Sequence, residues 1–296
     1  MKIAASHQTI NFGIVSVYST EKRSFEITNS LNQHILVTLK IEDEELKQSS
    51  PLSQVVPPQQ TAGFDITLYG TKPQNFLKQI VYMINENHEF SVNIAAQIVT
   101  IDVRLSKETI NFKFPENVVE TSVTESLTLY NKSNSVVHFN WTHFNAVFSV
   151  NYESGTIQPN CSQACEIKYH PGTEAHSEIT AVLNVVGGSQ RSLKLIGDMG
   201  KPKLSLEKKQ ISFGIVPLEK PRDVYVKLKN NSHDPAIYSI INPNEDVLTI
   251  YPMIGKIKPG ENQLLQVSVL FNSPTVFQSK VSVVICGASP ISFLVT

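Results

Sequence analysis

Two cysteines and two histidines near the middle of the chain have side chains that can bind a metal ion. Cys161 and Cys165 lie close together, and His170 and His176 follow them. A zinc site needs a second ligand pair with a spacing comparable to the first. His170 adjoins Tyr169, a predicted core position of an alternating strand, so its side chain is predicted to point away from that core. We therefore favour ordinary reduced cysteines near a turn and expect no metal site.

Motifs for catalysis are missing from the sequence. The eight histidines form no H-E-x-x-H or H-x-H cluster, and no G-x-S-x-G, P-loop or G-x-G-x-x-G string occurs. The acidic run at residues 42–45 follows a predicted strand and precedes a polar stretch, which favours a solvated loop over a cation site. We expect no enzyme activity and no cofactor. A hydrolase that uses Cys161 at an unrecognised site is the least favoured class.

Four asparagines match the glycosylation pattern N-x-[ST]: Asn131, Asn140, Asn160 and Asn230. The first eight residues have no apolar segment like that of a signal peptide, and three cysteines suit a reducing compartment. We therefore interpret these asparagines as turn or strand residues of a cytosolic protein. No stretch approaches the roughly 20 apolar residues that span a bilayer, so we expect no direct membrane insertion.

Charge is distributed unevenly along the chain. The whole chain has 25 basic and 26 acidic residues, a net charge of -1 that predicts no nucleic-acid binding. Residues 1–100 have seven basic and nine acidic side chains, and residues 101–200 have seven and ten. Residues 201–296 have eleven basic and seven acidic side chains. The last third is therefore the basic one.

A candidate partner-binding patch lies in this basic third. Lys227 and Lys229 alternate with apolar residues, so both are predicted to point outward from one strand, and Lys220 and Arg222 come just before them. Such a patch suits an acidic partner segment or the acidic surface of tubulin. The alternative is a solvated sheet face whose lysines protect an edge against aggregation.

A threefold repeat organises the elements that hold these residues. Residues 9–15 (TINFGIV) return as residues 109–115 (TINFKFP) and as residues 210–216 (QISFGIV). Other marks keep the same period of about one hundred residues: Asn29, Asn131 and Asn230, then Pro57, Pro159 and Pro259. Such a period indicates three structural units in series.

Alternating apolar residues flank each repeated asparagine and predict two strands joined by a turn. The preceding core positions are Phe25/Ile27, Leu127/Leu129 and Val226/Leu228, and the following ones are Val37/Leu39, Phe139/Trp141 and Tyr238/Ile240. Trp141 is thus predicted to be a core residue. Residues 187–190 (GGSQ) predict a hairpin turn with positive φ at its glycines.

About seven short strands per hundred residues, with no amphipathic helix, predict an all-β protein of two-sheet sandwiches. Hydrophobic residues make up 41% of the 296, enough for a core in each. We assign three domains, residues 1–100, 101–200 and 201–296, with borders near residues 98–102 and 198–202.

The repeated residues resemble a known family. The repeats follow a pattern of three short motifs in the same order: Phe-Gly-Ile-Val, then Asn-x-Ser, then Ile-x-Pro-Gly. This pattern is similar to the ASH domains of Hydin-like ciliary and centrosomal proteins. ASH domains are similar in turn to major sperm protein and to PapD-like immunoglobulin sandwiches. Two turns depart from the pattern. Lys113 replaces the usual glycine, which either removes a bulge or gives Lys113 a normal strand conformation, and residues 57–59 (PPQ) replace Pro-Gly.

The resemblance implies tandem immunoglobulin-like, seven-stranded domains that act as a non-catalytic scaffold. It implies a segment of a longer protein in the axoneme of a cilium or flagellum, or in the centrosome or basal body. The expected partners are other axonemal or centrosomal proteins, including microtubule-associated ones. The alternative is an adaptor like major sperm protein that binds short acidic peptide motifs.

Overall fold

In a computed structural model, residues 3–48, 52–115 and 119–296 are described, and all regular structure in these ranges is β-strand. The strands form three pairs of sheets, each with one four-stranded and one five-stranded sheet. None of the described residues forms a helix of the length and apolarity needed to cross a membrane. The predicted all-β class is confirmed.

The first sheet pair uses the first nine strands. One sheet has the order β1 (Ile3–Ala5), β3 (Thr20–Asn29), β7 (Gln60–Tyr69), β5 (Leu46–Gln48). The other has the order β2 (Thr9–Ser16), β9 (His88–Val99), β8 (Gln74–Ile84), β4 (Ile35–Lys40), β6 (Ser53–Val56).

The second and third pairs repeat this order. The second combines β10 (Val103–Leu105), β12 (Val123–Asn131), β16 (Ser162–Tyr169), β14 (Phe148–Val150) with β11 (Thr109–Phe112), β18 (Arg191–Asp198), β17 (His176–Val185), β13 (Val137–Thr142), β15 (Ser154–Ile157). The third combines β19 (Leu204–Leu206), β21 (Arg222–Asn230), β25 (Asn262–Val269), β23 (Leu248–Tyr251) with β20 (Gln210–Ile211), β27 (Ala288–Val295), β26 (Ser279–Ile285), β22 (Ala236–Ile241), β24 (Ile254–Ile257).

Each sheet pair has nine strands in the described residues, two more than the sequence predicted. The difference comes from short strands such as β1, β5 and β6, which have three or four residues. So few residues show too little alternation for a period-two pattern to appear. The sheet pairs succeed one another between β9 and β10 and between β18 and β19. The division into domains 1–100, 101–200 and 201–296 is kept as our proposal.

Parallel pairing joins an early strand of each sheet pair to its last strand. β2 pairs with β9 from Thr9 to Ser16, with a bulge between Asn11 and Gly13, whose φ is 75°. β11 pairs with β18 without a bulge, and Lys113 has no positive φ. The second sheet pair has therefore lost the bulge, and Lys113 follows the end of β11 without the positive φ that would strain its side chain.

The cores form where the alternating apolar residues of the two sheets meet. Trp141 is buried as predicted, in register with Leu39 and Ile240. One hydrophobic cluster runs through the first and second sheet pairs, and the third sheet pair has a cluster of its own. The first cluster also takes in Met199, Ile237 and Cys286, which lie where the second and third pairs meet.

The repeated asparagines are buried structural residues. The Asn131 side-chain amide donates to the carbonyl oxygens of Ser135 (2.7 Å), Ile157 (3.1 Å) and Gln158 (3.0 Å), and its Oδ1 accepts from the Ser133 amide (2.8 Å). Asn29 and Asn230 make the same kind of contacts in their own sheet pairs. Each asparagine thus ties the end of a strand to the segment before the repeated proline.

The turn after the repeated proline requires a residue with a positive φ, the left-handed backbone conformation. Gly260 has φ 74°, and Asn160 and Gln59 occupy the equivalent places with φ 56° and 57°. The strand pairing makes Pro58 the counterpart of Pro159 and Pro259, so the predicted Pro57 was wrong by one residue. The departure at residues 57–59 therefore keeps the turn geometry of the other two copies. At the predicted hairpin, Gly187 has φ 73° but Gly188 has no positive φ, so positive φ at both glycines was wrong. The backbone there bridges to Ile101, which constrains Gly188.

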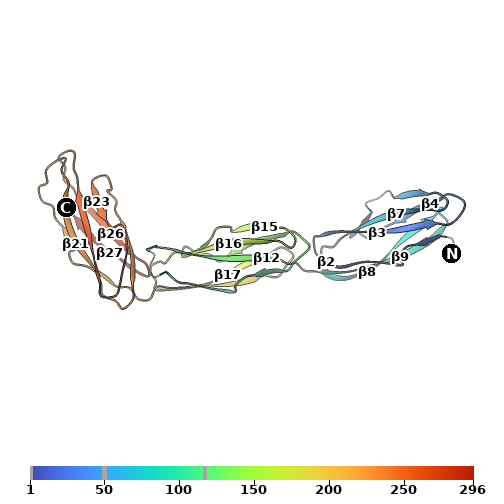
Figure 1. Ribbon diagram of the computed structural model, residues 1–296, viewed down its shortest axis with the longest axis horizontal. Helices are drawn as coiled ribbons and strands as arrows, with labels where there is room; N and C mark the ends of the chain where they lie inside the picture. The colour runs from blue at the N-terminus through green and yellow to red at the C-terminus, as the bar shows by residue number, and fades with distance from the viewer. Residues whose placement is uncertain (1–2, 49–51, 116–118) are drawn as a thin grey trace.

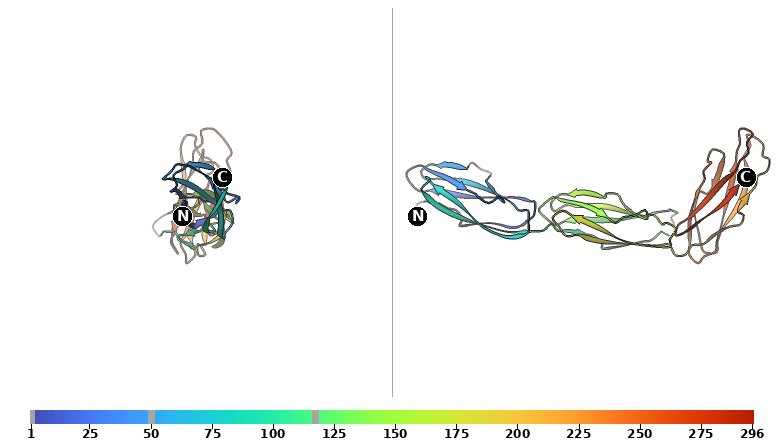
Figure 2. Two further views of the ribbon diagram at one scale, coloured as in Figure 1. Left: turned by 90° about the vertical axis from the view of Figure 1, so that its right-hand side faces the viewer. Right: turned by 180° about the vertical axis from the view of Figure 1, so that it is seen from behind.

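The three sheet pairs follow one another along the longest axis, with the termini at opposite ends (Figure 1). The strands of the first two pairs run roughly along this axis, whereas those of the third run steeply across it. The view from behind shows the same bend where the second and third pairs meet (Figure 2). The molecule is thus an elongated array with one marked change of direction.

Direct contacts connect consecutive sheet pairs. Between the first two, the Ser135 hydroxyl donates to the carbonyl of Val17 (2.6 Å), and Gly187 lies against the side chains of Val17 and Tyr18. Between the second and third, the Gly287 amide donates to the carbonyl of Gly172 (2.8 Å). Gly187 and Gly287 hold equivalent places in the last hairpin of their sheet pairs. The same hairpin thus contacts the preceding pair at both junctions.

Tyr238 gives the third core a predictable pH dependence. Burial raises the pKa of its phenol to about 12, and among the described residues its hydroxyl has no hydrogen-bond partner. An unfolded tyrosine titrates near 10, so the unfolded state binds fewer protons between these values and stability falls as pH rises from about 10 to 12. We expect Tyr238→Phe to flatten this fall and to leave stability at pH 7 equal or higher. Urea unfolding at pH 7, 10 and 11.5 measures both effects; an unchanged pH slope would contradict the assignment.

Candidate functional site

The outward side of β21, β25 and β23 forms the clearest candidate surface for a partner. Its residues share alternate positions on paired strands: Tyr225, Lys227 and Lys229 of β21, Leu264 and Gln266 of β25, and Tyr251 of β23. We call this set the outer face. The register places Lys227 opposite Leu264, and Gln266 between Tyr225 and Tyr251. Cationic and aromatic side chains therefore lie side by side on one face of the β21–β25–β23 sheet.

The predicted basic residues divide into two groups. Lys227 and Lys229 are exposed and alternate with buried Val226 and Leu228, so they share the outer face. Lys220 lies in the loop before β21, and Arg222 is the first residue of β21. Arg222 lies an even number of residues from the buried Val226, so it belongs to the inward-facing side of β21, although it is exposed at the strand end. The outer face thus contains two of the four.

Apolar members of the outer face were missed at the level of sequence. Tyr225 is 58% exposed, Leu264 52% and Tyr251 71%. Each comes from a different strand, and no motif in the sequence shows which strands pair. The alternation around Lys227 also applies to Tyr225, so one of the three could have been found.

A carboxylate closes one end of the outer face. Asp223 lies two residues before Tyr225 on the same side of β21, and its Oδ2 accepts from the Gln266 amide (3.0 Å). The charge on this surface thus changes from negative at Asp223 to positive at Lys227 and Lys229. Such a separation of charge favours one orientation of a bound partner over the reverse one.

The cysteines and histidines do not gather. Cys161 is exposed, Cys165 is buried, and His170 points outward as predicted. Burial raises the pKa of the Cys165 thiol, which keeps it protonated and makes it a poor metal ligand. Within the described ranges, no group of three or more histidine, cysteine or acidic side chains is arranged to hold a metal ion.

The acidic run at residues 42–45 lies in a loop before β5, as predicted. Asp43 pairs with Lys78 across 3.2 Å, and the Glu45 carboxylate accepts from the Gln74 amide. These contacts neutralise part of the run and are those of a partly solvated surface loop.

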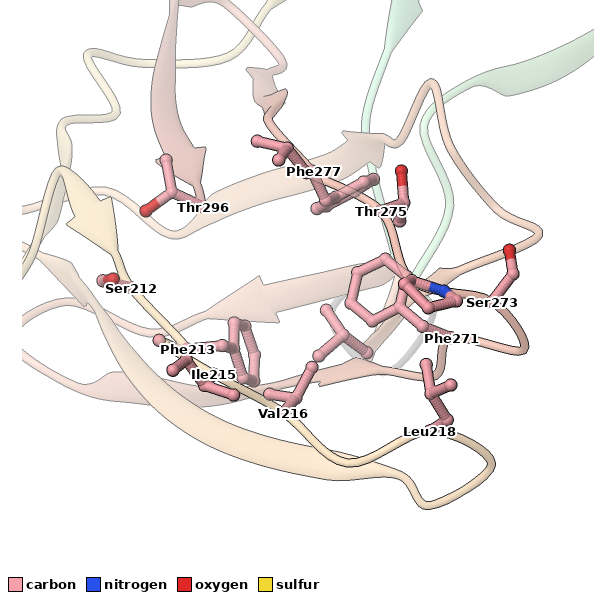
Figure 3. A pocket seen from close by; sticks show the side chains of 14 residues that line it. Ser212, Phe213, Ile215, Val216, Leu218, Phe271, Ser273, Thr275, Phe277 and Thr296 are labelled. Carbon is pink, nitrogen blue, oxygen red and sulfur yellow. The ribbon is translucent and has the colours of Figure 1, made fainter.

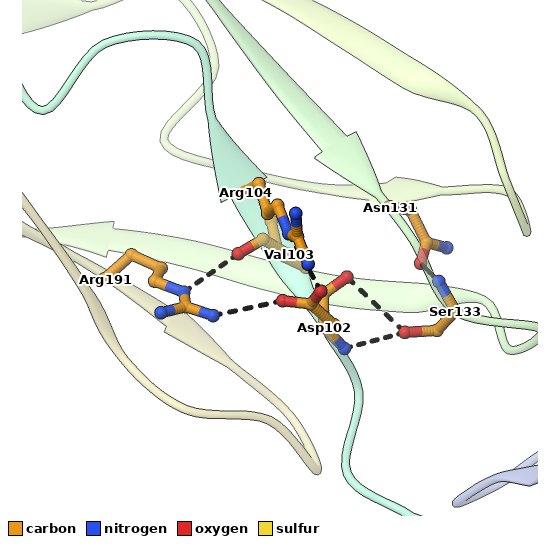
Figure 4. Close-up of polar contacts among 6 residues, drawn as sticks. All are labelled: Asp102, Val103, Arg104, Asn131, Ser133 and Arg191. Carbon is orange, nitrogen blue, oxygen red and sulfur yellow. Dashed lines mark hydrogen bonds and ion pairs between the residues drawn. The ribbon is translucent and has the colours of Figure 1, made fainter.

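Another charged cluster, around Asp102, is structural (Figure 4). The Asp102 carboxylate meets Arg104 (3.0 Å) and Arg191 (3.1 Å), and the Arg191 Nε also donates to the carbonyl of Val103 (2.9 Å). The Asp102 amide donates to the Ser133 hydroxyl (2.7 Å). These bonds fasten the start of the second sheet pair to its asparagine turn and to β18.

An apolar groove of ≈ 500 Å³ opens in the third sheet pair beside the end of β27. Phe213, Val216 and Leu218 follow one wall, and Phe271 and Phe277 lie on another, with Thr296 at the far end (Figure 3). Polar groups that could carry out a reaction are few in it, since its lining is mainly aliphatic and aromatic.

The third sheet pair is similar to a described family of domains. Residues 202–289 match the family described as HYDIN/CFA65/VesB-like, Ig-like domain. The resemblance to Hydin-like proteins is confirmed. The matched residues include the outer face and most of the groove.

Two relatives are similar to this chain over most of its length. The mouse protein named Cilia and flagella-associated protein 47 is 26% identical over 216 residues, which cover 72% of this chain and 7% of that protein. The human protein named Cilia- and flagella-associated protein 47 is 22% identical over 280 residues, 93% of this chain and 9% of that protein. The chain therefore spans less than a tenth of the length of either relative.

Solved structures of similar domains include two from the groups that the sequence resembles. PapD-like domain 7 of human CEP192, an ASH domain, aligns at 14% identity with a TM-score of 0.30, over 33% of this chain and 85% of that one. WR4, a major sperm protein family member of C. elegans, aligns at 16% identity with a TM-score of 0.27, over 32% of this chain and 97% of that one.

Proposed function

We propose that the chain is a non-catalytic segment of a Hydin-like scaffold in the axoneme of a cilium or flagellum. The observation that carries the proposal is the match of residues 202–289 to a HYDIN/CFA65/VesB-like domain in a chain whose two relatives are named cilia- and flagella-associated. The elongated array supports it, because consecutive sheet pairs in contact keep their ends far apart (Figure 1).

Imaging tests the location. A fluorescent tag on the protein in ciliated cells is expected to label the length of the axoneme. A signal confined to membrane contact sites would overturn the scaffold and favour the adaptor that binds acidic peptides. Labelling of the basal body alone would overturn the axonemal location and favour a scaffold of the centrosome or basal body.

The outer face is the surface that we propose for docking an acidic partner, with the microtubule as its first candidate. Lys227 and Lys229 supply positive charge, and the exposed rings of Tyr225 and Tyr251 supply apolar area. Tyrosine is enriched among residues that dominate binding energy, and charge complementarity sets the association rate and the choice of partner. Lys220 and Arg222, outside the face, add to the positive field around it.

Reversing two charges is expected to abolish this docking. Lys227→Glu/Lys229→Glu exchanges two cations for two anions and should weaken binding to polymerised tubulin by at least about tenfold. The binding of the unaltered chain should itself fall between 50 and 300 mM salt, since exposed charges are screened. Co-sedimentation of the 296-residue chain with microtubules measures both.

A matched variant separates position from net charge. Lys208→Glu/Lys209→Glu makes the same change of net charge at two exposed residues between β19 and β20. This variant should keep most of the binding. Equal loss in the two variants would overturn the outer face as the docking surface, and no binding by the unaltered chain would overturn the microtubule as the partner.

A further inference from the structure

A cleft of ≈ 360 Å³ opens where the first and second sheet pairs meet, and we call it the junction cleft. Its lining comes from the end of the first sheet pair, from the linker and from the facing end of the second: Tyr18, Tyr69, Ile101, Val136, His138 and Val186. These described residues include no acidic side chain, no lysine and no arginine. A ligand for this cleft therefore needs apolar surface and hydrogen-bonding groups instead of charge.

Two tyrosine rings form the side of the cleft that belongs to the first sheet pair. The Tyr18 amide donates to the carbonyl of Gly70 (2.8 Å), so Tyr18 lies beside the end of β7, where Tyr69 is the last residue. Tyr18 is 43% exposed and Tyr69 38%, so each ring has a packed side and a free side. Such rings pack against a partner at a low cost in conformational entropy, because tyrosine has only two side-chain torsions.

The Tyr18 ring is held in place from two directions. The backbone of Tyr18 is left-handed, with φ 64°, and the equivalent Glu219 of the third sheet pair has φ 59°. The turn requires this conformation in both sheet pairs, although it is strained for a bulky side chain. The ring itself lies against Gly187 of the second sheet pair, where a Cβ atom would be 2.6 Å from the Tyr18 Cε2. The turn and the junction contact thus fix the ring before any partner binds, which lowers the cost of binding.

Apolar side chains form the rest of the cleft. Ile101 is 4% exposed and lies at its floor, and its amide donates to the carbonyl of Gly187 (2.9 Å). The neighbouring Val186 is 58% exposed, and its amide donates to the carbonyl of His138 (3.1 Å). These bonds keep the linker and the hairpin of the second sheet pair beside the tyrosines.

Hydrogen-bonding groups surround this apolar floor. Among the residues that the structure describes, none forms a hydrogen bond with the hydroxyl groups of Tyr18 and Tyr69 or with the imidazole of His138. A tyrosine hydroxyl can donate a hydrogen bond, so both can bind a backbone carbonyl of a ligand. The cleft thus combines two aromatic rings, a small apolar floor and free donors.

We propose that the junction cleft binds a proline-rich segment of another protein in the polyproline II conformation. Such a segment has no internal hydrogen bonds, so its carbonyl oxygens are free to accept from the tyrosine hydroxyls. Its proline rings are uncharged and pack on tyrosine rings, as they do in the aromatic-lined grooves of other domains. An acidic segment fits this cleft poorly, because no described lining residue is a lysine or an arginine.

Binding of decaproline to the whole chain tests the proposal. We expect saturable binding with a Kd below about 1 mM, measured by a titration followed by NMR. The amide signals of Tyr18, Ile101 and Val186 should shift, and those of the outer face should not. No binding, or shifts elsewhere only, would overturn the proposal.

Two ring removals compare the cleft with another exposed tyrosine. Tyr69→Ala deletes a ring of the cleft and should weaken decaproline binding by about tenfold or more. Tyr152→Ala deletes a ring that is 52% exposed in the loop between β14 and β15, outside the cleft, and should leave binding unchanged. Equal affinities for the two variants would contradict the assignment of the cleft.

Conservative variants keep the packing and test the hydroxyl groups. Tyr18→Phe/Tyr69→Phe retains both rings and the contact with Gly187, and should weaken binding about three- to tenfold through the lost hydrogen bonds. Unchanged affinity would overturn the role of the hydroxyl groups. Stronger binding of decaglutamate than of decaproline at the cleft would overturn the choice of partner. Lys227→Glu/Lys229→Glu should bind decaproline as the unaltered chain does, so the cleft and the outer face can fail separately.

Discussion

Asn131→Ala is expected to destabilise the second sheet pair by about 3 kcal/mol or more, since it leaves buried carbonyls and an amide without partners. Asn131 is 1% exposed, and its side chain makes four hydrogen bonds to backbone atoms. Trp141 is the single tryptophan of the chain and lies in this core. Urea unfolding followed by tryptophan fluorescence therefore reports the second sheet pair selectively.

A second asparagine of the same sheet pair provides the control. Asn140 also matches the glycosylation pattern but is exposed on β13. Asn140→Ala should change the midpoint of unfolding by little, within about 0.5 kcal/mol. If the two variants unfold at the same urea concentration, the buried amide is not what holds the turn to the strand end.

Gly187→Ala is expected to loosen the contact between the first two sheet pairs, at a cost of about 2 to 4 kcal/mol. Gly187 has φ 73°, and a Cβ atom there would lie 2.6 Å from the Tyr18 ring and 3.0 Å from Val17. The added methyl group thus meets both backbone strain and a collision across the junction. Small-angle X-ray scattering should show a broader distribution of molecular dimensions, and calorimetry should resolve the first two pairs as separate transitions.

Gly260→Ala isolates the effect of the backbone. Gly260 has nearly the same φ, 74°, but nothing lies within 4 Å of its Cβ position. This variant should lower the stability of the third sheet pair slightly and leave the scattering curve unchanged. Identical scattering for Gly187→Ala and the unaltered chain would show that the junction does not depend on this contact.

Much of the fold could be predicted from the repeat. Three copies in register identify core positions such as Phe25, Leu127 and Val226, because chance alternation seldom recurs at one period. The shortest strands could not be found, since pairing rather than local pattern creates them. The normal conformation of Gly188 was missed for a similar reason, because the contact with Ile101 comes from a distant part of the chain.

The candidate surface could be predicted only in part. Alternation places Lys227 and Lys229 outward, and the structure has them there. Tyr251 and Leu264 join them through the pairing of β23, β25 and β21, which depends on folding across many residues. The groove was invisible in the sequence, since nothing in the motif at residues 210–216 shows that Phe213 and Val216 line it.

The parallel pairing at the end of each sheet pair decides how the array responds to tension. A pull on its two ends slides an early strand against the last strand, so all hydrogen bonds between them resist in shear and break together. β2 and β9 share seven paired positions, β11 and β18 four, and β20 and β27 two. We therefore expect that, under a rising force, the second sheet pair yields before the first.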